Sequence, residues 1–206
     1  MDEQDRAPEG GRRPYRLKER AVRQEETRRR ITEAAVALHQ ERGPLATTIS
    51  AIAERAGVQR LTVYRHFPEE ASLFAACTRH YFSLHPFPDP AAWSEIGDPV
   101  ARLHSVLGEL YAYWGRTEQM FSAVLRDAEV DAERSRTAPL AAYLSHARNV
   151  LVAGWRVRGR RRRLLVGVVG HAVQFHTWRS LVRDHDLSDA EAVDLMVMLV
   201  SEAMSR

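Results

Sequence analysis

The chain lacks the features that mark secreted and membrane proteins. Its single cysteine, Cys77, cannot form a disulfide within the chain. The opening sequence MDEQDRAPEGGRRP holds no apolar segment of the kind found in signal peptides. No run reaches the roughly 18 consecutive apolar residues that span a membrane. We therefore expect a cytoplasmic protein in which Cys77 is a small core residue.

Motifs of common enzymes and metal sites are missing as well. The sequence has no glycine-rich phosphate loop, no G-x-S-x-G and no H-E-x-x-H. Nine histidines are present, but His171 and His176 lie five residues apart and fall on different faces of a helix. We expect no catalytic activity, no metal site and no cofactor.

Strand-like alternation is also absent, and the patterns that remain are helical, which predicts an all-α protein of two domains. Residues 1–22 are rich in proline, glycine and charge and should form a disordered basic arm. Residues 23–84 form a first helical domain. Residues 85–99, with four prolines, are expected to be a linker, and residues 100–206 form a second, larger helical domain.

Lysine is nearly absent, since Lys18 is the only one among 30 basic residues. Residues 1–83 hold 15 Lys+Arg against 12 Asp+Glu, whereas the rest of the chain holds 15 against 15. The excess positive charge therefore lies in the first domain and its arm, which weakly indicates a nucleic-acid partner. A disordered, solubilising tail is the alternative interpretation of the arm.

The most informative segment is TTISAIAERAGVQRLTVYRHF, residues 47–67. It predicts two short helices joined by a glycine turn. Thr48 is suited to cap the first helix through its hydroxyl. Gly57 ends that helix, because glycine tolerates the positive φ of a sharp turn. Val58 and Val63 give the second helix a face anchored in the core, so this pattern is typical of a helix-turn-helix.

The other side chains of the second helix are mostly polar. A helical hairpin inside an ordinary core is the alternative, but burying so many polar groups without partners costs roughly 1 to 3 kcal/mol each. Exposed groups of this kind suit contacts with phosphates and base edges. The predicted DNA-binding residues are Thr48, Ser50, Gln59, Arg60, Leu61, Thr62, Tyr64, Arg65 and His66.

Two flanking helices support this motif. Upstream, TRRRITEAAVALHQERG places Ile31, Ala34, Ala35 and Leu38 on one helical face and stops at Gly43. Downstream, PEEASLFAACTRHYF opens with proline and acidic residues, as helix starts often do.

With these three elements the chain resembles the TetR family of bacterial transcriptional regulators, over roughly residues 24–82. The resemblance implies an N-terminal three-helix, helix-turn-helix DNA-binding domain and a larger C-terminal helical domain that dimerises and binds a small effector. Two residues depart from the family pattern. Leu61 replaces a small residue, and Glu70 stands where a lysine is frequent, which affects the expected phosphate contacts.

The last two predicted helices, about 160–184 and 189–204, have broad apolar faces that we expect to pair with a second copy. The alternative is that these faces cover the same chain's core. The residues concerned are Leu164, Leu165, Val168, Val169, Ala172 and Phe175, then Val193, Leu195, Met196, Leu199, Val200 and Met204.

Aromatic side chains gather on the helices of the second domain. They are predicted to line an apolar effector pocket that takes an apolar or aromatic ligand, with simple core packing as the alternative. These residues are Tyr111, Trp114, Phe121, Trp155, Phe175 and Trp178. The arginine run RVRGRRRRLL, residues 156–165, is interpreted as a solvated loop.

Together these patterns predict a homodimeric repressor, released from a palindromic double-stranded DNA operator by a small effector. The alternatives are an activator or non-allosteric regulator, and a helical ligand-binding or catalytic protein whose N-terminal domain no longer binds DNA.

Overall fold

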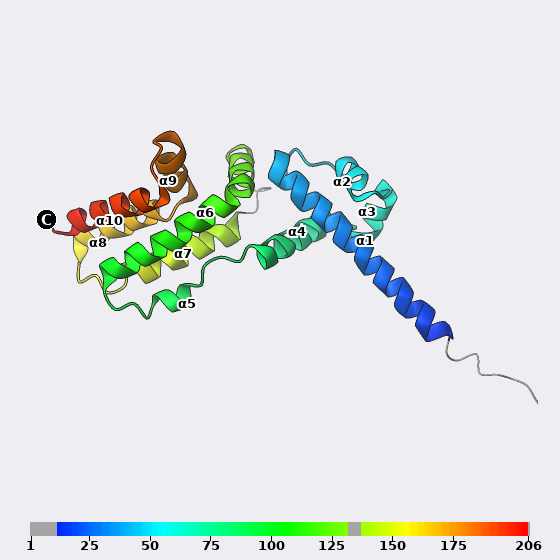
Figure 1. Ribbon diagram of the computed structural model, residues 1–206, viewed down its shortest axis with the longest axis horizontal. Coiled ribbons are helices and arrows are strands. Elements are labelled where there is room, and N and C mark those ends of the chain that lie inside the picture. Colours follow the sequence, from blue (N-terminus) through cyan, green and yellow to red (C-terminus); the bar gives the residue numbers. More distant parts are fainter. Residues whose placement is uncertain (1–11, 132–136, 206) are drawn as a thin grey trace, which may run out of the picture. The chain divides into compact units, whose positions relative to one another are not determined.

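The computed structural model describes residues 12–131 and 137–205, and these residues form helices joined by turns and loops, with no strand among them (Figure 1). They fall into two compact units. The first unit comprises the chain up to His39 together with Ala46–Leu84. The second comprises Gln40–Leu45 and the chain from His85 onward. None of the described helices is long and apolar enough to cross a membrane.

The described part of the first unit, from residue 12 on, contains the helices α1 (Arg12–Arg42), α2 (Ile49–Ala56), α3 (Arg60–His66) and α4 (Glu70–Leu84). Ile31, Ala35 and Leu38 of α1 are buried at the predicted spacing. Cys77 of α4 is buried in the same core, and burial raises the pKa of its thiol to about 12. The thiolate is therefore disfavoured, as expected for a core residue rather than a redox sensor.

Helix α1 begins earlier than the sequence indicated. Its first residue is Arg12, inside the segment 1–22 that we expected to be disordered, so Arg12–Val22 is helical instead. The composition of that segment is polar, but its alanine, arginine and glutamate residues are good helix formers and continue the helix that the core anchors further on. The remainder of the expected arm lies outside the described residues.

The second unit is built around the long helix α6 (Pro99–Val130), which packs on α7 (Ala138–Val152), α9 (Phe175–Arg179) and α10 (Asp189–Ser205). Asp98 caps α6 by accepting a 2.7 Å hydrogen bond from the Ala101 N–H. Helix α6 continues without a break through Met120 and Leu125.

The helix predicted at about 160–184 is also divided differently. It consists of α8 (Gly159–Ala172), α9 and a π-helical turn, η1 (Ser180–Asp184). Gln174 has extended backbone angles, and the Thr177 hydroxyl donates a 2.6 Å hydrogen bond to the His171 carbonyl at the break. The break lets Phe175 and Trp178 turn into the core, where both are buried.

The expected linker 85–99 packs against the second unit rather than standing free. It contains the short helix α5 (Pro90–Trp93). Tyr143 donates to the Pro88 carbonyl at 2.9 Å, and the Tyr143 ring stacks on Phe87 at 4.2 Å between centroids. The buried Arg102 guanidinium donates to the carbonyls of Ile96, Val150 and Ala153. These contacts hold the segment to α6 and α7.

Candidate nucleic-acid interface

The turn between α2 and α3 has the geometry that the sequence predicted. The Thr48 hydroxyl accepts a 3.2 Å hydrogen bond from the Ala51 N–H at the start of α2. Gly57 has φ 64° and ψ 40°, the left-handed conformation that a glycine adopts without strain. The Val58 N–H donates to the Ala53 carbonyl at 2.9 Å, which closes the helix end.

One face of helix α3 packs on the core of the first unit, and the opposite face is exposed. Val63 is fully buried, and Phe67, directly after the helix, is buried as well. By contrast Leu61 is 75% exposed and Tyr64 is 44% exposed. This division leaves one face of α3 open to a partner.

The structure gives the nine predicted DNA-binding residues the following places. Two lie at the start of α2, where Thr48 is the cap and Ser50 is exposed on the first turn. Gln59 caps α3 without a side-chain hydrogen bond. Thr62 and His66 are half-buried, whereas Gln59, Arg60, Leu61, Tyr64 and Arg65 are exposed. Both helices belong to the first unit, so the residues lie on neighbouring elements of one compact body.

Arg28 of α1 positions the end of α3, a role that the sequence did not reveal. Its guanidinium lies 4.0 Å from the centroid of the Phe67 ring. It also donates a 2.5 Å hydrogen bond to the His66 carbonyl. Because one guanidinium contacts both the Phe67 ring and the His66 carbonyl, Arg28 holds the end of α3 against α1. The spacing of Arg28 within α1 carries no signal for this contact, because its partners are 38 and 39 residues away.

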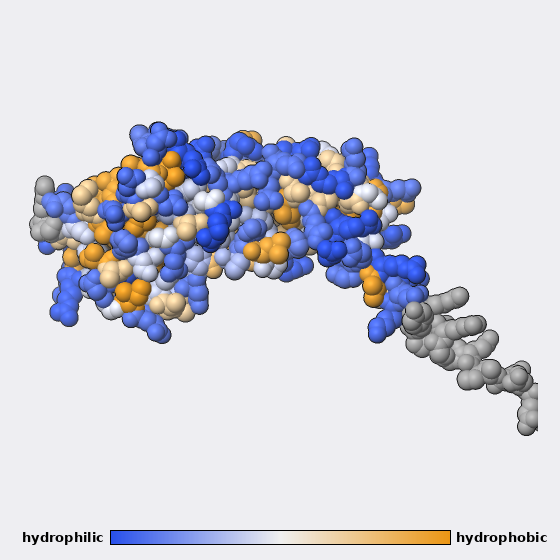
Figure 2. All heavy atoms as spheres, in the orientation of Figure 1, coloured by the Kyte–Doolittle hydropathy of each residue, from blue (hydrophilic) through white to orange (hydrophobic). Residues whose placement is uncertain are grey.

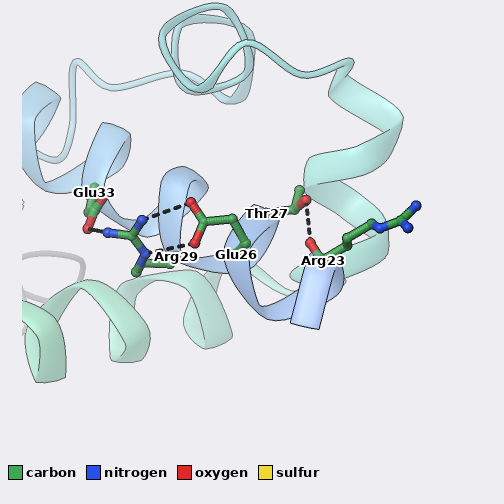
Figure 3. Close-up of polar contacts among 5 residues, drawn as sticks. All are labelled: Arg23, Glu26, Thr27, Arg29 and Glu33. Atoms are coloured by element: carbon green, nitrogen blue, oxygen red, sulfur yellow. Dashed lines mark hydrogen bonds and ion pairs between the residues drawn. The ribbon is translucent and has the colours of Figure 1, made fainter. Parts of the chain in front are cut away.

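The neighbouring arginine is engaged within α1 itself (Figure 3). Arg29 forms 2.8 Å ion pairs with both Glu26 and Glu33. The hydrogen bond from Arg29 lowers the pKa of the Glu26 carboxyl. The charge of Arg29 is therefore balanced by two carboxylates, and it contributes little to the net charge of this face.

A hollow of about 600 Å³ lies between the exposed part of α1 and the end of α3. Three arginines and His66 line it, together with Glu19, Gln24 and Thr27; the arginines are Arg20, Arg23 and Arg65. Glu19 pairs with Arg23 at 3.5 Å, which leaves the lining with a net positive charge. Burial, and then the charges of Arg65 and Arg28, lower the pKa of His66. This hollow suits an anion such as a phosphate group of DNA.

Glu70, which departs from the family pattern, has a defined place in the structure. Glu70 is exposed and is the first residue of α4, where a carboxylate interacts favourably with the helix dipole. In the described ranges, no group of three or more histidine, cysteine, aspartate or glutamate residues could hold a metal ion.

Five of the six predicted effector residues, all except Trp155, are buried in the packed interior of the second unit. Trp114, Phe121 and Phe175 contact one another edge to face or tilted, with centroids 5.0 to 6.1 Å apart. Trp178 continues the cluster at 5.5 Å from Phe175. The Tyr111 hydroxyl donates to the Ala172 carbonyl at 3.0 Å. Trp155 stands apart and half-buried at the end of α7, and its ligand role stays a prediction.

Comparison with known proteins adds independent observations. Residues 31–77 match the family model of bacterial regulatory proteins, tetR family. The chain is 34% identical over 104 residues to the HTH-type transcriptional repressor KstR of Mycolicibacterium smegmatis, covering 50% of each protein. It is 36% identical over 97 residues to the HTH-type transcriptional regulator TtgR of Pseudomonas putida, covering 47% of this chain and 45% of that protein. The matches thus span about half the length of these curated relatives.

The fold has relatives among solved structures. The crystal structure of a tetR-family transcriptional regulator from Streptomyces coelicolor superimposes with a TM-score of 0.61. The two chains are 23% identical, and the match covers 88% of this chain and 81% of the other. At this identity the likeness supports a common helical fold.

Proposed function

We propose that this chain, whose residues 31–77 match the family model of bacterial regulatory proteins, tetR family, is a transcriptional repressor that binds an operator in double-stranded DNA. The observation that carries the proposal is the division of α3 into a buried anchor, Val63, and an exposed face that presents Arg60, Tyr64 and Arg65. An anchored helix with protruding donors is what reading of the major groove requires.

The phosphate backbone of the DNA would contact the protein beside α3. The hollow lined by Arg20, Arg23, Arg65 and His66 is positively charged and adjoins the end of α3. Contacts of this kind carry no sequence information, but they fix the orientation of the reading helix on the duplex. The helical part of the predicted N-terminal arm therefore contributes to DNA affinity.

A homodimer is part of the proposal, since a single helix-turn-helix reads only a few base pairs and two-fold symmetry reads a palindrome. Most of the predicted apolar face of α8 and α10 is buried in the chain's own core, including Leu165, Val169 and Val200. A narrower set stays exposed: Leu164, Met198 and Leu199. Figure 2 shows hydrophobic residues gathered over this part of the molecule. We propose that these side chains meet their copies in a partner subunit.

Release by a small effector completes the proposed mechanism. A ligand that binds the second unit more tightly in one conformation shifts the population toward that conformation. If the two α3 helices of the dimer then no longer match successive major grooves, DNA affinity falls by the difference in ligand binding energy.

The experiment that tests the proposal is a gel-retardation assay with the DNA flanking the chain's own gene and with random DNA of equal length. Preferential retardation of the flanking fragment at physiological salt supports an operator-binding regulator. Equal or absent retardation would instead favour the helical ligand-binding protein that does not read DNA. Reporter expression from the same promoter distinguishes a repressor from an activator.

A further inference from the structure

The second unit contains a hollow that the predicted aromatic residues do not line. It has a volume of about 470 Å³ and lies between the end of α6, helix α7 and helix α8. Its apolar wall is formed by Leu125, Leu140, Leu144, Val166 and Val173, and its polar groups come from Thr137, Ser145, Arg148 and Gln174. The size falls in the range of small-molecule sites, which is roughly 300 to 1,000 Å³.

The described residues that line this hollow include one cation. Arg148 lines it and donates a 3.1 Å hydrogen bond from Nη2 to the Ser145 hydroxyl. Its Nε is enclosed and finds no acceptor within the described residues. No aspartate or glutamate is among the described residues of the lining. Arg148 is half-buried, so its guanidinium is only partly hydrated, and an anion in the hollow can form a charge-assisted hydrogen bond with it.

We propose that this hollow binds an aliphatic carboxylate, whose charged group pairs with Arg148 and whose hydrocarbon chain lies along the leucine and valine side chains. Arginine suits this partner because its planar donors match the two oxygens of a carboxylate. No aromatic ring is among the described residues of the lining, so a flexible alkyl chain fits it better than the aromatic ligand expected from the sequence.

The hollow adjoins a contact that leads toward the helix-turn-helix. Leu125 of the lining is followed in α6 by Arg126 and Asp127. Asp127 accepts a 2.8 Å hydrogen bond from the Leu45 N–H, and Arg126 donates to the Arg42 carbonyl at 3.2 Å. The segment 40–45 belongs to the second unit and joins α1 to the residues that precede α2. A ligand that shifts this part of α6 therefore acts on the chain entering the DNA-binding unit.

This regulatory consequence rests on the proposed function, but binding of the ligand does not. The first test uses the unaltered protein and two probes of equal length, decanoate and the neutral decanamide, in isothermal titration calorimetry. Decanoate should bind about ten- to a hundredfold more tightly, since only it forms a charge-assisted pair. Equal affinity for the two probes, or no binding of decanoate, overturns the proposal.

Variants test the residues. Arg148→Met should lower decanoate affinity by about tenfold or more and remove the preference over decanamide. Its control, Arg161→Met, removes an exposed arginine of α8 outside the lining and should leave both affinities unchanged.

A second pair of variants tests the volume of the hollow. Ala141→Phe fills the hollow and should weaken the binding of both probes. Ala142 is the neighbouring residue, also exposed but outside the lining, and Ala142→Phe should leave the binding of both probes unchanged.

Two further measurements separate the possible failures. If Arg148→Met changes the mass in solution instead of decanoate affinity, the hollow is a subunit interface and the ligand site is wrong. Decanoate that binds through Arg148 without altering DNA retardation supports the site and contradicts effector release. Retardation of operator DNA without decanoate binding contradicts the site and leaves the proposed DNA-binding function standing.

Discussion

Arg60 and His66 stand at the two ends of α3 and differ in their surroundings. Arg60 is exposed at the first helical position and has no ion pair within the described chain. His66 lies at the last position beside Arg65, and its carbonyl is bound by Arg28. Arg60 is thus available to a base edge, whereas His66 is placed toward the basic hollow.

Replacing Arg60 tests base reading. Arg60→Ala should weaken operator binding by about 1 to 3 kcal/mol, because a bidentate contact to guanine is lost. Folding should be unaffected, as the side chain is exposed. Fluorescence anisotropy with operator and random DNA measures the effect. Arg79→Ala, which removes an exposed arginine of α4, is the control for charge alone. Unchanged affinity in Arg60→Ala would remove this residue from the interface.

His66 should make DNA binding dependent on pH. Its pKa is lowered in the free protein by burial and by the charges of Arg65 and Arg28, against an opposing effect of Glu25. A nearby phosphate raises the pKa, so the complex binds a proton more tightly than the free protein does. DNA affinity should therefore rise as the pH falls from about 8 to 6 and level off below the lowered pKa.

The measurement for His66 is the dissociation constant across this pH range at fixed ionic strength. His66→Gln keeps a hydrogen-bonding side chain but cannot titrate, so its pH profile should be flatter than that of the unaltered protein. Identical profiles would show that His66 does not approach the phosphates.

Among the elements, the segment between α1 and α2 is constrained by its contacts with Asp127. Gly43 has φ +90°, and a Cβ at this position would lie 2.5 Å from Asp127 Oδ2. The same oxygen accepts the hydrogen bond from the Leu45 N–H. The turn therefore requires glycine at position 43 for two reasons: its φ is positive, and the Asp127 carboxylate leaves no space for a Cβ.

Gly43→Ala should destabilise the protein by about 1 to 3 kcal/mol, because alanine is strained at this φ and displaces Asp127. Thermal unfolding would show the loss as a lower Tm, by about 2–4 °C per kcal/mol. Gly97→Ala is the matched control, since it lies in a loop where a Cβ meets nothing within 4 Å. Equal Tm values for the two variants would contradict the close packing of this turn.

At the scale of the whole molecule, the proposed homodimer can be tested at Leu199. Leu199 is 46% exposed in the single chain, so a charge there need not disturb the fold of the subunit. Buried against a partner, the same charge has no compensation. The exposed residues of α8 and α10 thus allow the assembly to be tested separately from folding.

Leu199→Asp should convert a dimer into monomers at micromolar concentration, as measured by analytical ultracentrifugation. Operator affinity should fall sharply with it, although every side chain predicted to contact DNA remains. Val130→Asp is the control, since Val130 is 79% exposed on α6 and is not among the residues of the proposed interface. A dimer that survives Leu199→Asp would place the interface elsewhere.

The sequence alone determined the helix-turn-helix, because its signals are local. The cap at Thr48, the turn at Gly57 and the anchor at Val63 each depend on residues a few positions apart, and such spacing specifies backbone geometry directly. The same holds for the apolar stripe of α1. The DNA-binding residues followed from this motif as predictions, since the exposed side of α3 is the complement of its anchored side.

The tertiary structure alone decided the features that depend on distant residues. Arg28 reaches Phe67, Asp127 binds the turn at Leu45, and the division between α8 and α9 places Phe175 against Trp114. Arg148 lines a hollow only because α6, α7 and α8 converge there. Helical periodicity shows which face of a helix is apolar but not which partner covers it, so these contacts left no pattern in the sequence.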